Sequence, residues 1–133
     1  MRGVLKHGLP SKENIKYRDG HCLSYDRATR NPRWVGEHLT AAALAVKAAK
    51  RSDHFLEDPS EPPIFRARLA DYRRSGYDRG HMAAAADQKQ SQHAMDSTFL
   101  LSNMCPQVGD GFNRDVYRDA FSICRAAVRL ANP

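Results

Sequence analysis

Residues 71–87 read DYRRSGYDRGHMAAAAD, and the interpretation of the whole chain starts from the tetrapeptide Asp78-Arg79-Gly80-His81 within them. It places an acid, a fixed cation, a flexible residue and a titratable base side by side. Histidine titrates near neutral pH and can take a proton from water. Arginine can neutralise charge on a phosphate, and glycine lets the backbone approach a ligand. A lone histidine in a polar, glycine-containing segment is more often a surface loop residue, so both interpretations stay open.

A second polar stretch follows at residues 94–115, which read AMDSTFLLSNMCPQVGDGFNRD. Asn113 lies where the pattern turns helical, and the common role of asparagine at such a position is the helix N-cap. Its amide oxygen could also bind a hard cation, because Mg²⁺ prefers oxygen ligands and usually keeps several of its waters. Composition alone does not choose between the two roles.

The surrounding sequence predicts short strands and helices within a single domain covering residues 1–133. We expect strands at 21–26 and 33–38 joined by a loop at 27–32, a helix at 41–50 capped by Thr40, a loop at 51–63, a helix or turn at 64–74, a helix at 95–99, a strand at 99–104, a loop at 106–111 and a helix at 113–130. Strands with a helix on one side are typical of an α+β fold.

The composition limits the class of partner. The chain carries 21 Lys+Arg against 15 Asp+Glu, a net charge of +6, which favours an anionic partner such as nucleic acid or an acidic membrane surface. No run approaches the ~20 apolar residues that a membrane span needs. The N-terminal MRGVLKHGLP has charge but no apolar segment typical of a signal peptide, and it shows no visible targeting leader.

The three cysteines, Cys22, Cys105 and Cys124, are widely spaced and lack a CxxC motif. This argues against a disulfide framework or a zinc site and predicts reduced, mostly buried thiols. An arginine-rich stretch over residues 66–79, with Tyr72 and Tyr77 between the arginines, is a weak signal for a nucleic-acid groove, since such stretches are usually solvated.

Taken in order, several segments closely resemble the DNA/RNA non-specific endonuclease family. They are HGLP (7–10), LSYD (23–26), PRWVGEHLT (32–40), DYRRSGYDRGHMAAAAD (71–87) and AMDSTFLLSNMCPQVGDGFNRD (94–115). The likeness is strongest to the mitochondrial endonuclease G branch, especially its fungal members. The likeness covers residues 7 to about 119 and fades from Ala120 onward. Such motif matches are hypotheses about structure.

The resemblance implies a ββα-metal nuclease core with a mixed or antiparallel sheet. It implies that His81 activates water, that Asn113 holds a hydrated Mg²⁺, with Mn²⁺ as an alternative, and that Arg79 contacts phosphate within a motif completed by Asp78 and Gly80. An upstream family arginine corresponds to Arg51, and a downstream one to Arg125. The implied activity is sugar-non-specific hydrolysis of DNA and RNA, and the implied setting is a mitochondrial homodimer.

The chain departs from the family where the last helix usually carries a glutamate eight residues after the metal-binding asparagine. This chain has Phe121 there. At 3.6 residues per turn, Phe121 and Arg125 lie about 80° and 120° from Asn113, whereas Asp119 lies about 240° away and is a poor substitute. The glutamate normally helps orient metal-bound water, so we expect reduced activity.

Family chains also begin earlier and continue further, so the resemblance implies that this chain lacks the C-terminal part of the family fold and could be a fragment of doubtful independent stability. Two competing functions remain. One is a degenerate nuclease that binds nucleic acid without efficient cleavage. The other is a structural domain with a basic surface, which would require the motif series to be a coincidence.

Overall fold

The DRGH tetrapeptide forms a strand in the computed structural model, which describes residues 5–131. Strand β4 (Asp78–His81) pairs antiparallel with β5 (Met104–Gln107), with His81 opposite Met104. The alternative interpretation of His81 as a surface loop residue is therefore wrong. The expected strand at 99–104 is also misplaced, because Leu101–Asn103 forms a 3₁₀ turn (η3) and the strand begins only at Met104. The buried Asn103 side chain bonds to the backbone of Ala83 and fixes that turn.

A second antiparallel sheet contains β1 (Ile15–Tyr17), β2 (His21–Asp26) and β3 (Asn31–Glu37), in that spatial order. The expected strand at 21–26 is confirmed, and the next begins at Asn31 rather than residue 33. Strand β1 was not expected, because three residues carry too little pattern to identify a strand. Both sheets and the flanking helices together form the predicted α+β fold.

The helices are shorter than the alanine-rich sequence suggests. Thr40 caps α1 as predicted, accepting a hydrogen bond from the Ala43 amide, but α1 (Ala41–Ala45) stops well before residue 50 because Val46 is extended. The short elements η1 (Pro63–Phe65), α2 (Leu69–Tyr72) and η2 (Ala85–Asp87) lie between strands, and η4 (Gly109–Asn113) joins β5 to α4. Helix α3 (Gln92–Ser97) starts earlier than expected. The last helix, α4 (Val116–Ala131), is the longest.

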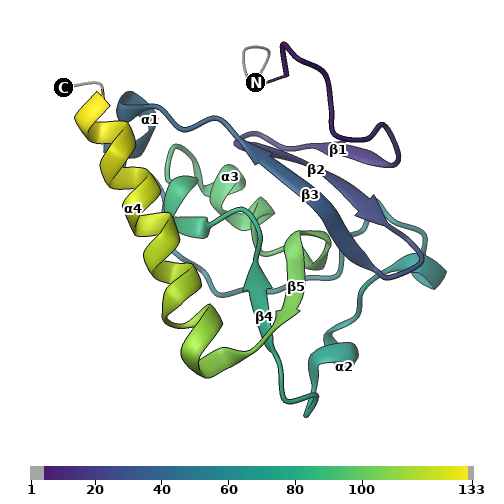
Figure 1. The fold of residues 1–133 in the computed structure, drawn as a ribbon. Helices are drawn as coiled ribbons and strands as arrows, with labels where there is room; N and C mark the ends of the chain where they lie inside the picture. Colours follow the sequence, from purple (N-terminus) through teal and green to yellow (C-terminus); the bar gives the residue numbers. More distant parts are fainter. Residues whose placement is uncertain (1–4, 132–133) are drawn as a thin grey trace.

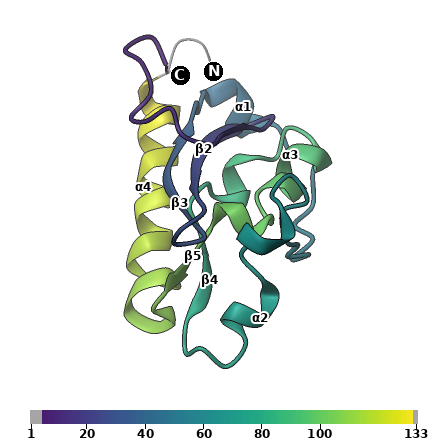
Figure 2. The same ribbon diagram turned by 90° about the vertical axis from the view of Figure 1, so that its right-hand side faces the viewer.

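The elements β4, β5 and α4 give the ββα arrangement that the resemblance implies (Figure 1). Figure 2 shows α4 along one side of the strands and α3 on the other. Met95 and Phe99 belong to one buried cluster, Leu101 and Met104 belong to another, and Phe55 packs against both. The chain segment that carries Phe55 is therefore fixed against the core behind β4.

Two further sequence expectations concern cysteines and membrane spans. Cys22 is buried and Cys105 partly buried, but Cys124 is exposed on α4, so the expectation of mostly buried thiols is wrong for that residue. All three thiols are free. Within residues 5–131, none of the helices combines the length and the apolar character that crossing a membrane requires.

His21 on β2 is fully buried, and neither of its ring nitrogens has a hydrogen-bond partner among the described residues. A buried polar group without partners costs about 1–3 kcal/mol. We therefore expect His21→Leu to raise the free energy of unfolding at neutral pH by that amount. Denaturant unfolding of both proteins measures the difference, and a variant less stable than the wild type would contradict this account of His21.

The same substitution should reduce the acid sensitivity of the protein. Burial, together with the charge of Arg18, lowers the pKa of His21 from 6.5 to about 4. Between these values the unfolded chain binds this proton while the folded chain does not, so stability falls as the pH drops from 6.5 to 4. The fall in Tm across this range should be smaller in His21→Leu, whereas His93→Leu, at an exposed histidine, should behave like the wild type.

Candidate active site

The structure brings the predicted site residues to one cavity between β4 and α4. The cavity has a volume of about 460 Å³. Its lining includes His81, Arg79, Asn113, Arg51 and Arg125. These residues come from four separate segments of the chain, and no local pattern alone would place them together. The lining also contains Phe121, so this residue lies on the same side as Asn113, as the helical spacing predicts.

The ring of His81 is held between two phenylalanine rings. Phe55 and Phe99 meet it edge to face, with centroids 5.7 and 4.8 Å from that of the imidazole. Its Nε2 is buried and has no hydrogen-bond partner among the described residues. Aromatic packing, rather than a hydrogen bond, therefore sets the orientation of this ring.

This environment keeps the histidine neutral. Burial and, after it, the nearby positive charge of Arg51 lower the pKa of His81 to about 4, against an opposing contribution from Asp53. At neutral pH the imidazole is therefore unprotonated. An unprotonated imidazole beside a solvent-accessible cavity can accept a proton from water.

The same two phenylalanine rings also contact the guanidinium groups of two arginines beside His81. The guanidinium of Arg79 lies 4.0 Å from the ring centroid of Phe55, and that of Arg51 lies 5.0 Å from the centroid of Phe99. Cation–π contacts of this kind position an arginine without neutralising it. Among the described residues Arg79 has no carboxylate within ion-pair distance, whereas Arg51 pairs with exposed Asp53 at 2.6 Å.

Asn113 is held by the acidic residue of the DRGH motif. Its Nδ2 donates to Asp78 Oδ2 at 2.9 Å, while Arg114 donates to both carboxylate oxygens of Asp78 at 2.9 and 2.8 Å. Hydrogen bonds from Arg114 and then from Asn113 lower the pKa of Asp78, which stays ionised. Because a carboxylate accepts only from the amide nitrogen, the amide orientation is fixed and Oδ1 is the atom left to bind a cation.

Asn113 is not the helix N-cap. It lies in η4, before α4 begins at Val116, and Gly111 with φ +82° allows the kink between the two. At this kink the side chain of Asp115 accepts a hydrogen bond from the Gly111 amide. The angular estimate that placed Phe121 and Arg125 near Asn113 is thus correct in outcome, although Asn113 lies outside the regular helix.

Arg125 lines the cavity but already has a partner. Its Nη1 donates to Asp87 Oδ1 at 2.8 Å, and the Asp87 side chain is fully buried. Burial raises the pKa of the neighbouring Glu37 to about 7. Arg125 therefore stabilises buried acidic groups, and contact with phosphate through this residue remains a prediction.

Sequence reasoning missed two cations of the cavity, Arg114, which pairs with Asp78, and Arg118. Arg118 is exposed, and its contacts with Asp115 and Asp119 are long, at 3.9 and 3.6 Å. The available signal was its spacing of seven residues from Arg125, which places both on one helix face. Its guanidinium is freer to meet a ligand than that of Arg125.

Gly80 has a different role from the one expected. A Cβ at this position would lie 2.1 Å from the Gln107 side chain, so a larger residue would force Gln107 on the partner strand to move. Neither Gly80 nor Asp78 lines the cavity. Both motif residues act indirectly on the site. Gly80 allows β4 to pack against β5, and Asp78 orients the side chain of Asn113.

The donor set suits a hydrated magnesium ion. Within residues 5–131 no group of three or more His, Cys, Asp or Glu side chains could hold a metal ion. A cation in the cavity would therefore be bound by Asn113 Oδ1 and by water. Mg²⁺ accepts such a site because it binds hard oxygen and keeps several waters, whereas zinc requires several nitrogen or sulfur ligands.

Comparison with known proteins places this geometry in a family. The family model of the DNA/RNA non-specific endonucleases matches residues 2–130, further than the motifs suggested. The mitochondrial nuclease of Saccharomyces cerevisiae is 50% identical over 129 residues, which are 96% of this chain and 39% of that protein. A nuclease of Syncephalastrum racemosum is 54% identical over 84% of this chain and 36% of its own length.

A solved structure supports the same family assignment. The crystal structure of an EndoG/EndoGI complex contains a chain with a TM-score of 0.91 and 46% sequence identity, covering 96% of this chain and 53% of that one. Human mitochondrial endonuclease G is 48% identical over 79% of this chain and 35% of its own length. The chain thus spans about half, or less, of the relatives cited here. By its motifs, its ββα arrangement and these matches, it belongs to the DNA/RNA non-specific endonuclease family.

Proposed function

We propose that this chain is a magnesium-dependent endonuclease that hydrolyses phosphodiester bonds in DNA and RNA. The observation that carries the proposal is a neutral histidine, His81, in the same arginine-lined cavity as the amide of Asn113. A base able to accept a proton, cations able to hold phosphate and an oxygen ligand for a hard metal ion are the parts that metal-assisted hydrolysis requires.

Each residue has a role that follows from its surroundings. His81 takes a proton from the water that attacks phosphorus, and it does so through Nδ1, because Nε2 is buried. Arg79 and Arg118 hold the phosphate, since Arg79 has no carboxylate partner among the described residues and the two carboxylate contacts of Arg118 are long and exposed. Asn113 holds the metal ion, and Asp78 keeps its amide oriented. Bound magnesium, or manganese in its place, would supply positive charge to the phosphate and to the leaving 3′-oxygen.

The substrate range follows from where these contacts fall. Groups that bind phosphate and metal make no distinction between bases, and they do not require or exclude a 2′-hydroxyl. DNA and RNA should therefore both be cleaved. Several relatives are named as mitochondrial proteins, which supports a mitochondrial location, and a homodimer is proposed from the family resemblance alone.

A second candidate function rests on Phe121. The family resemblance implies a glutamate at this position, and the cavity of this chain has an apolar ring there. A chain that lacks this carboxylate could bind nucleic acid and cleave it poorly. Supercoiled plasmid, incubated with purified protein in magnesium or in EDTA, separates the two candidates. Magnesium-dependent nicking supports the nuclease, while binding of the plasmid without nicking by the folded protein supports the second.

Substitution of Phe121 tests whether the missing carboxylate limits the rate. We expect Phe121→Glu to increase the magnesium-dependent rate of plasmid nicking, by up to about tenfold if the carboxylate orients metal-bound water as outer ligands of metal sites do. Arg118 and Arg125, three residues before and four after, stabilise a glutamate there. The measurement is the initial nicking rate beside Phe121→Gln, which has similar size and no charge. Equal rates for both variants and the wild type would mean that another step limits the reaction.

A further inference from the structure

Aromatic rings follow one another along the start of α4, next to the metal-binding asparagine. Phe112 stacks on Tyr117 with centroids 5.4 Å apart and planes inclined by 25°, and Tyr117 meets Phe121 edge to face at 4.8 Å. Tyr117 and Phe121 line the cavity, and Phe112 is 43% exposed. The hydroxyl of Tyr117 contacts Met82 Sδ at 3.7 Å, which holds the central ring in place. The row is therefore fixed, and it is accessible to a ligand.

Arginines flank this row of rings. Arg118 and Arg125 lie three residues before and four after Phe121 in the same helix, which places them on the face that carries the ring. Both line the cavity together with Arg114. Partly exposed rings between guanidinium groups suit a strand that offers flat bases and phosphates in alternation. An apolar ligand without charge would leave these cations unused.

We propose that Phe112, Tyr117 and Phe121 form a stacking platform for unpaired nucleotides beside the cleavage site, so that the chain prefers single-stranded nucleic acid. The proposal rests on the proposed nuclease function and names its substrate class. In a duplex the faces of each base are covered by its neighbours, and only an unpaired strand can place them on protein rings. Phe121, where the family has an acid, extends the platform into the cavity.

Binding measured without metal tests the proposal independently of cleavage. The probes are a fluorescent thymidine oligonucleotide, the same oligonucleotide with abasic residues in its central segment, and a hairpin duplex of equal charge, all in EDTA. Fluorescence anisotropy of the wild type should show the thymidine strand bound roughly 5- to 100-fold more tightly than the abasic strand. Equal affinity for the two strands would overturn the proposal, because phosphate contacts alone would then explain binding.

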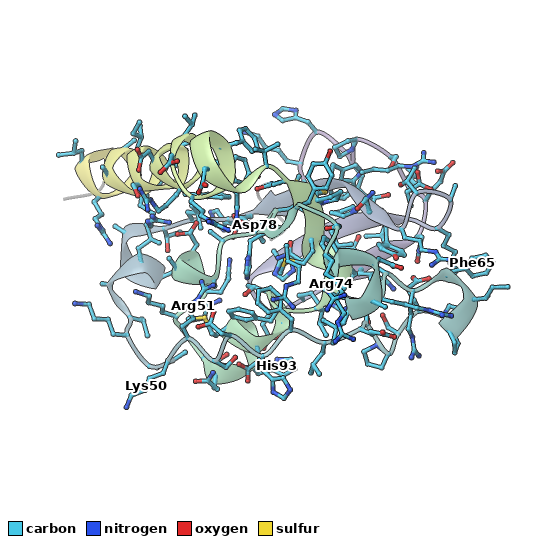
Figure 3. All side chains as sticks on the ribbon, turned by 90° about the horizontal axis from the view of Figure 1, so that it is seen from below. Lys50, Arg51, Phe65, Arg74, Asp78 and His93 are labelled. Carbon is cyan, nitrogen blue, oxygen red and sulfur yellow. The ribbon has the colours of Figure 1, made fainter. Side chains whose placement is uncertain are left out.

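Substitutions of single phenylalanines test which ring causes the preference for the thymidine strand. Phe121→Leu keeps an apolar side chain but loses the ring, and it should remove most of the preference for the thymidine strand while leaving duplex affinity unchanged. Phe121→Tyr keeps the ring and should retain the preference. The control is Phe65→Leu, which removes a phenylalanine that also lies beside an arginine but stands at the end of the molecule away from Arg51 (Figure 3). Loss of the preference in Phe65→Leu, or its retention in Phe121→Leu, would overturn the assignment.

The two proposals fail in different ways. Circular dichroism first establishes that each variant is folded, and the comparison of thymidine and abasic strands needs only the wild type. A protein that nicks plasmid in magnesium but does not distinguish these strands has the proposed function and lacks the platform. A protein that distinguishes them but does not nick plasmid has the platform and lacks the proposed function.

Discussion

His81→Ala is expected to abolish magnesium-dependent nicking of supercoiled plasmid while leaving nucleic-acid binding nearly unchanged. A positioned general base contributes about 10²–10⁴ to the rate, and among the described residues no second histidine lines this cavity. Binding should persist, because Arg79, Arg118 and Asn113 keep their positions. The experiment compares initial nicking rates with affinities for an oligonucleotide in EDTA.

The pH dependence of the wild type provides a second measure of the same residue. Because burial lowers the pKa of His81 to about 4, the imidazole stays neutral and able to accept a proton through the mildly acidic range. Loss of the histidine base at acidic pH should therefore set in well below the ordinary histidine value. His93→Ala is the matched control, since His93 is exposed and pairs with Asp19 outside the cavity. Loss of binding together with cleavage in His81→Ala would contradict the role of general base.

The sequence predicts the identity of the central residues better than their surroundings. His81 and Asn113 were predicted as site residues because the chemistry and the family motif agree on them, and the structure places both in one cavity. Phe55 and Phe99 were not, although they hold the histidine, because they lie 26 residues before and 18 after it in the sequence. Contacts of this kind depend on the fold and leave no local periodicity.

In the fold, too, some elements were predictable from the sequence and others were not. The strand at residues 21–26 was predictable because a turn follows directly and its residues are almost all buried. The helix at 41–50 was predicted too long, because alanine propensity is weak beside tertiary contacts. Beyond Val46 the backbone bonds to another segment instead, with the Ala48 amide donating to Lys89 O and the Lys50 amide donating to Gln92 Oε1. The DRGH strand is polar and short, and its partner β5 is far away in the sequence.

Asn113→Ala is expected to lower the magnesium-dependent nicking rate by about 10²–10³, the cost of removing one electrostatic stabiliser of a transition state. Asn113 is the residue whose oxygen is free to hold the ion, because its Nδ2 is bonded to Asp78. The alanine variant should stay folded, since Arg114 still satisfies both oxygens of Asp78. Nicking rates across a magnesium titration provide the measurement.

The substitution Asp78→Asn separates binding of the ion from orientation of its ligand. It keeps the size of Asp78 but removes the negative charge that fixes the Asn113 amide, so the side chain of Asn113 can turn and present its nitrogen to the cavity. We expect a smaller loss of about 10- to 100-fold, as for residues that orient metal ligands, with part of the rate restored at high magnesium. Asn31→Ala, at an asparagine outside the cavity, should match the wild type. An Asn113→Ala protein that nicks plasmid at the wild-type rate would show that the ion is held elsewhere. That result would contradict both the role of Asn113 as the metal ligand and the role of Asp78 in orienting the Asn113 amide.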